Sequence, residues 1–291
     1  MHAPDEALRF RSHPVAATVQ GDDEGVLLPV PNPLFTRLAP WLLLPLYLAA
    51  ALAVDAWSTP IAQPADYHRF ADARALLGIP NFADVVSNLA ILLPALCGLL
   101  QVQARDAQAG FGSPTERAFA TVFFLALVSV GLGSTWYHLA PDNDRLLLDR
   151  LPIALAFTSL IAWLIAERSW LRRAGALALL PWIAVGPASV LWWYAGELAG
   201  AGDLRPYLVL YAFAFILPPL LMRLPSPYNR RSAYWTAYAA FALGMVCDRL
   251  DHEIHALLGG LISGHTIKHL LMGFAIAALA RMLFLRRLRF R

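Results

Sequence analysis

The sequence predicts an all-α fold, a polytopic bundle of helices that crosses a membrane several times. Of its 291 residues 58% are hydrophobic and only 15% are charged, whereas a soluble domain is typically about 25% charged. The apolar residues gather into runs near the roughly 20 residues that a helix needs to cross the hydrocarbon core. Since unpaired backbone groups are costly in hydrocarbon, these runs are expected to be helices rather than open strands.

Eight such runs are predicted to be spans, separated by short segments rich in Pro, Gly, Asp and Arg. Residues 1–33 carry prolines and charges without a long apolar run, so they are expected to form a mobile cytoplasmic tail. Residues 34–291 then form a single transmembrane domain. Its predicted spans are about 38–57, 85–103, 117–139, 147–166, 174–194, 206–222, 233–256 and 264–285.

The arginines indicate an orientation. If the C-terminal "RRLRFR" (286–291) is cytoplasmic, eight spans place the N-terminus in the cytoplasm too, and most other arginines fall on that side, as the positive-inside rule requires. The basic residues are all arginine except Lys268, which favours a bacterial cell membrane. Arginines scattered over loops argue against a nucleic-acid partner.

Titratable residues converge at the predicted outer end. Ser134 and His138 share one face of the run 117–139, and Asp149 begins the next run. His265 and His269 are a second pair four residues apart on one helix face. Polar residues inside a membrane are expensive, and a functional role is the default explanation.

Three imidazoles with a fourth position left open form the catalytic arrangement of zinc. His138, His265 and His269 are therefore predicted to bind Zn²⁺, with Asp149 as general base and Ser134 as donor to an oxyanion. The alternative is that these are interfacial histidines facing lipid headgroups. Asp251 and His255, near the end of the run 233–256, are predicted either to orient the zinc ligands or to form the wet end of a helix.

Four sequence stretches resemble those of one known family. The chain resembles the alkaline ceramidases, integral membrane hydrolases, over roughly residues 66–285. The stretches that carry the resemblance are "IPNFADVVSNL" (79–89), "GSTWYH" (133–138), "DRLP" (149–152) and "HTIKH" (265–269).

This resemblance implies a seven-helix core with an intramembrane zinc site that hydrolyses the amide bond of ceramides. It implies the same roles for His138, His265, His269, Asp149 and Ser134. The run 38–57 precedes the matching region and becomes an extra N-terminal helix. The chain departs from the family between its last two histidines, where Thr266, Ile267 and Lys268 replace the usual aromatics.

The family also carries a calcium site. At the matching positions Asp66, Asp72 and Asn81 offer oxygen ligands for Ca²⁺, while Arg69 and Arg74 oppose a cation. The alternative is an ordinary outer loop with helix caps.

Three functions stay open on the sequence alone. The first is a zinc-dependent amidohydrolase acting on ceramide or another N-acyl membrane lipid. The second is a receptor-like or lipid-binding protein of the wider superfamily, which also holds the adiponectin and progestin receptors. The third is a structural or transport protein without metal. Protein partners are not predicted.

Overall fold

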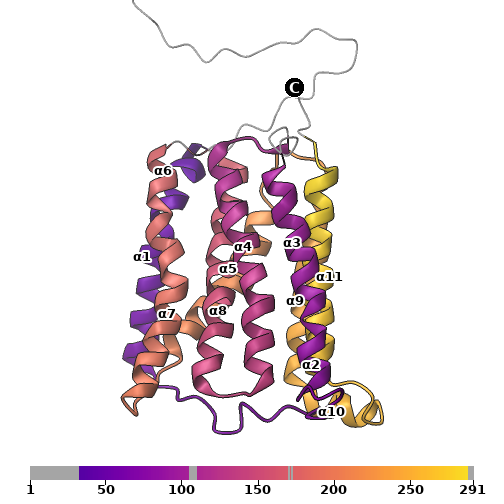
Figure 1. Ribbon diagram of the computed structural model, residues 1–291. Coiled ribbons are helices and arrows are strands. Elements are labelled where there is room, and N and C mark those ends of the chain that lie inside the picture. Colours follow the sequence, from indigo (N-terminus) through magenta and orange to yellow (C-terminus); the bar gives the residue numbers. More distant parts are fainter. Residues whose placement is uncertain (1–32, 105–109, 170, 172, 288–291) are drawn as a thin grey trace, which may run out of the picture.

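The computed structural model describes residues 33–104, 110–169, 171 and 173–287, so all but the last residue of the predicted tail lies outside the described residues. Within them the chain forms helices and no β-strand, and the long helices pack side by side with alternating direction (Figure 1). The predicted all-α bundle is confirmed. The helices are α1 (Pro33–Trp57), α2 (Phe82–Ser87), α3 (Leu89–Gln103), α4 (Pro114–Leu139), α5 (Asn143–Ser169), α6 (Arg173–Ala178), α7 (Leu180–Leu198), α8 (Arg205–Met222), α9 (Ser232–Arg249), α10 (Asp251–Leu257) and α11 (Gly264–Leu285).

Seven candidate membrane spans are found among the described residues. By length and composition these segments can cross a membrane, which makes the chain an integral membrane protein. They are Pro33–Trp57, Phe82–Gln103, Pro114–Leu139, Asn143–Ser169, Ala174–Leu198, Arg205–Met222 and Gly264–Leu285.

The remaining predicted span, 233–256, is divided. The α9 helix ends at Arg249, Leu250 departs from helical geometry, and the short helix α10 begins at Asp251. The break falls in a stretch of charged residues, which favour an aqueous end over hydrocarbon. The α9 helix still packs along α11 in the bundle (Figure 1), but it is not among the seven segments that are long and apolar enough to span.

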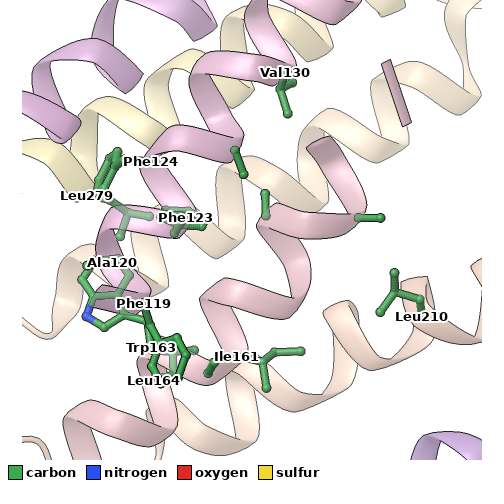
Figure 2. Packing of buried hydrophobic residues seen from close by; sticks show 14 of the residues in the cluster. Phe119, Ala120, Phe123, Phe124, Val130, Ile161, Trp163, Leu164, Leu210 and Leu279 are labelled. Atoms are coloured by element: carbon green, nitrogen blue, oxygen red, sulfur yellow. The ribbon is translucent and has the colours of Figure 1, made fainter. Parts of the chain in front are cut away.

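The core is centred on α4 and α5, which lie at the middle of the bundle (Figure 1). Trp163 of α5 is fully buried and packs against Phe123 and Phe124 of α4, at centroid distances of 5.7 and 6.1 Å (Figure 2). The α1 helix lies at the edge of the bundle, and only 17% of its apolar window is buried, against 61% for α5. Its peripheral place agrees with an extra helix added to a core.

A buried cluster of charged residues joins the helix ends at the side where α11 finishes. Arg286 pairs with Glu116 of α4 at 2.8 Å, and Arg168 pairs with Glu167 of α5 at 2.9 Å. Arg286 also lies 3.4 Å from Glu167, and Tyr228 donates to Glu116. All four charged side chains are almost fully buried, so each charge depends on its partners.

We expect Glu167→Gln to destabilise the protein strongly, because Arg168 loses its carboxylate while it stays buried. Removing one partner of a buried pair typically costs about 3–5 kcal/mol. Thermal unfolding of the purified protein in detergent would measure this loss. The control is Asp142→Asn, whose pair with Arg145 is partly exposed and is expected to contribute less than about 1 kcal/mol. Equal effects of the two changes would contradict the role of the cluster.

The alternation of the helices gives a topology test. Asp203 and Ser226 lie beyond opposite ends of α8, so a reporter fused after each should report opposite sides of the membrane. The arginine distribution predicts Asp203 outside and Ser226 inside. If both reporters lay on the same side of the membrane, the alternating bundle would be wrong. If the Asp203 reporter lay inside and the Ser226 reporter outside, the predicted orientation would be wrong.

Candidate metal centre

Three buried histidines from two helices meet at the end of the bundle near α10. His138 comes from the last turn of α4, and His265 and His269 come from the first turns of α11. One nitrogen from each ring lies within 4.8 Å of the other two, which makes the three a group that could hold a metal ion. The predicted convergence of these residues is therefore confirmed by the fold.

Hydrogen-bond partners of the Nδ1 atoms orient two of the three imidazole rings. His265 Nδ1 lies 2.8 Å from a carboxylate oxygen of Asp248, and an ionised carboxylate only accepts, so Nδ1 carries the proton. Ser87 Oγ donates to the Asp84 carbonyl oxygen and lies 2.8 Å from His269 Nδ1. It therefore accepts from that nitrogen too. In both rings Nε2 keeps its lone pair, as a metal ligand needs.

The nitrogen spacing fits zinc. His138 Nε2 and His265 Nε2 are 3.1 Å apart, and two zinc–nitrogen bonds of about 2.0–2.1 Å at a tetrahedral angle would place their nitrogens about 3.3 Å apart. His138 Nδ1 is buried without a hydrogen-bond partner. Two facing imidazole nitrogens at this distance either share one proton or, when both are deprotonated, can hold a cation between them.

Close helix contacts set this geometry. Ser263 caps α11 by accepting from the Thr266 backbone N–H. A Cβ on Gly264 would lie 2.1 Å from the Cys247 carbonyl oxygen, so only glycine lets α11 begin this close to α9. Similarly, a Cβ on Gly133 would lie 2.3 Å from the Leu148 carbonyl oxygen, so α4 and α5 approach closely beside Ser134 and Asp149.

Ser134 and Asp149 face the same cavity as the histidines. The cavity has a volume of about 800 Å³ and is lined by Ser134, Asp149 and all three histidines. Ser134 lies beside Asp149. The residues predicted as acid–base pair and metal ligands therefore open into one space.

Two residues predicted to orient the ligands have other surroundings. Asp251 accepts from the backbone N–H groups of His265 and Ala71, at 2.7 and 2.9 Å, so it fixes the backbone rather than an imidazole. His255 is not among the described residues that line the cavity. The carboxylate that contacts a ligand ring is that of Asp248, one helical turn before Asp251.

The calcium prediction finds no support in the side-chain contacts. Arg74 donates to both carboxylate oxygens of Asp72, at 2.7 and 2.6 Å, and these hydrogen bonds lower the pKa of Asp72. The Asn81 side chain donates to the His138 carbonyl oxygen at 2.8 Å, so it holds the end of α4. Asp66 is exposed at the cavity mouth. The arrangement is that of a loop braced by its own polar groups.

Other groups at the centre were missed from the sequence as site residues. Phe70 covers the histidines from the loop before α2, with ring centroids 4.6 Å from His138 and 4.7 Å from His265. Lys268 Nζ lies 2.9 Å from Asp248 and 3.3 Å from His265 Nε2. Lys268 lies about one helical turn after His265 and one residue before His269. This spacing is the only feature of the sequence that could have indicated Lys268 as a site residue.

Metal analysis tests the site. The purified protein should hold about one zinc ion per chain, as a three-histidine site does, and His265→Ala should lose it. Asp248→Asn should weaken zinc binding by about 10- to 100-fold, because the carboxylate orients His265. His252→Ala, at the cavity mouth, should keep zinc. Full zinc content in His265→Ala would show that the histidines are not the ligands.

Comparison with known proteins adds no assignment. No protein-family model matches the chain, and no curated protein matches it. The functional argument therefore rests on the geometry of the site and on the sequence stretches described above.

Proposed function

We propose that this protein is a zinc-dependent intramembrane amidohydrolase that cleaves the amide bond of ceramide or another N-acyl lipid. One observation carries the proposal: the buried three-histidine group opens, together with Ser134 and Asp149, into a long apolar cavity. The resemblance to alkaline ceramidases supports the same function through the same residues.

The cavity suits a lipid chain. Beyond the polar residues it is lined by apolar side chains of α4, α5, α8, α9 and α11, and its wall extends along α5 from Asp149 to Leu164. At 1.5 Å per residue this stretch of α5 is about 22 Å long. An alkyl chain with its polar end at the histidines would be buried along this length and stabilised by the hydrophobic effect.

The zinc ion, when bound, would supply a nucleophilic water near neutral pH and polarise the amide carbonyl. Asp149 is suited to take a proton from the attacking water and pass it to the leaving nitrogen. The oxygen–carbon bond forms first, and the carbon–nitrogen bond breaks once the nitrogen has received the proton, which yields an amine and a fatty acid. Ser134 is suited to donate a hydrogen bond to the developing oxyanion, since its hydroxyl lies beside Asp149 at the cavity wall.

The loop before α2 is suited to keep bulk water away from this step. Phe70 lies over two of the histidines, and Asp251 holds the adjacent Ala71 backbone N–H. Exclusion of water strengthens electrostatic interactions within a site. In the orientation indicated by the arginines, this end faces the outer leaflet.

A lipid-binding role with little hydrolysis is the second candidate. Lys268 favours it, because its ammonium group lies 3.3 Å from His265 Nε2 and would compete with a metal for that lone pair. The cavity serves a binding protein equally well, so product formation separates the two functions.

Substitutions at Asp149 and Ser134 test catalysis separately from metal binding. Asp149→Asn should keep zinc and lose general-base assistance, a loss of about 10²- to 10⁴-fold in turnover. Ser134→Ala should keep zinc and lose about 10²- to 10³-fold, as for one oxyanion donor. Turnover would be measured with labelled ceramides and other N-acyl lipids, with and without chelator.

The matched controls for these substitutions lie on the same two helices. Asp144→Asn on α5 and Ser129→Ala on α4 change exposed side chains and should leave turnover unchanged. Loss of zinc in Asp149→Asn would make Asp149 a ligand instead of a base. Unchanged turnover in both site variants would leave the lipid-binding role.

A further inference from the structure

Arg150 is a buried charge for which the proposed reaction gives no role. It follows Asp149 on α5, two turns inside the helix, and is only 5% exposed. Its side chain lines the cavity. An ionised group at this depth is expensive and needs a compensating partner.

The surroundings of Arg150 compensate the charge only in part. The guanidinium carbon lies 4.4 Å from the ring centroid of Trp193, 4.8 Å from that of Tyr67 and 5.5 Å from that of Tyr207. These faces attract the cation, but Nη1 has no hydrogen-bond partner although it is buried.

Other buried cations in the described part of the chain have carboxylate partners. Arg286 pairs with Glu116, Arg168 with Glu167, and Arg205 with Asp203. Lys268, the other cation of the cavity wall, pairs with Asp248. No carboxylate of the described residues forms an ion pair with Arg150.

We propose that Arg150 binds the carboxylate of a long-chain acyl lipid in this cavity. A guanidinium presents a planar fork of donors that matches a carboxylate, and the unfilled Nη1 leaves part of that fork free. One cation with Asp149 close by suits a single negative charge better than a phosphate dianion. The apolar length of the cavity would bury the attached chain.

This inference deepens the proposed function and, for the identity of the substrate, rests on it. The carboxylate has two chemical sources: the headgroup of an N-acyl amino acid, or the fatty acid released by hydrolysis of any N-acyl lipid. In both cases a carboxylate at the end of an alkyl chain occupies the space beside Asp149.

Equilibrium binding tests the carboxylate site without any turnover. The full chain in nanodiscs would be titrated at alkaline pH, where the acid is ionised, with a long-chain fatty acid and with the alcohol of equal chain length. The wild-type protein should bind the acid about 10- to 100-fold more tightly than the alcohol, as expected for hydrogen bonds to a charged group. Equal binding of acid and alcohol would overturn the proposal without need of a variant.

Substitutions at Arg150 assign the preference to this residue. Arg150→Gln should abolish the preference for the acid, and Arg150→Lys should keep part of it because the charge remains without the fork. Arg249→Gln is the matched control, since it removes an exposed arginine from the cavity mouth and should keep the preference. An unchanged preference in Arg150→Gln would overturn the proposal.

Hydrolysis assays distinguish the two sources. An N-acylglycine and the N-acylethanolamine of the same chain differ in the headgroup carboxylate. If the headgroup is the ligand, Arg150→Gln should raise KM about 10- to 100-fold for the N-acylglycine alone. If the released acid is the ligand, Arg150→Gln should relieve inhibition by fatty acid. It should then change KM equally for the N-acylglycine and the N-acylethanolamine. Absence of hydrolysis with an intact acid preference would remove the proposed reaction and leave the carboxylate site standing.

Discussion

Inside this bundle the partners of a polar side chain come from the protein itself, because hydrocarbon offers none. Such polar contacts are found at both ends of the bundle. Near the end of α11, carboxylates of α4 and α5 meet Arg286 and Arg168. At the other end, Ser87 and Asp248 meet the histidines of α11. The Arg286–Glu116 and Ser87–His269 contacts join helices that are distant in sequence, so they fix how these helices stand relative to one another.

Between these two polar ends lies the space that gives the protein its proposed chemistry. The packed part of the core, around Trp163 and the α4 phenylalanines (Figure 2), holds α4 against α5. Next to it the walls of α5, α8, α9 and α11 stay apart and enclose the apolar cavity. The three histidines that could hold a metal are thus placed where the chain of the proposed lipid substrate would end. Close approach through Gly133 and Gly264 places the polar side chains within reach of one another, and preorganisation of this kind is what an electrostatic catalyst requires.

The charges around the cavity differ in how completely they are compensated. Asp248 serves both His265 and Lys268, so a change at this one carboxylate acts on a ligand and on a cation together. Arg150 is held by aromatic faces and keeps an unfilled donor. This difference gives the two cations different roles. Lys268 is paired with Asp248 beside the histidines, whereas Arg150 keeps the unfilled donor that the proposed carboxylate site requires.

The sequence by itself determined the class of the protein and the three histidines that the fold brings together. Composition and the length of the apolar runs predict a helical membrane bundle, because both reflect the solvent around each helix and need no tertiary contact. The spacing of Ser134 with His138 and of His265 with His269 predicts shared faces, since helix periodicity is local. Tertiary structure alone decided the partners: Asp248 rather than Asp251 beside the His265 ring, and aromatic rings beside Arg150. These choices depend on distances between segments far apart in the chain, and no local pattern carries that information.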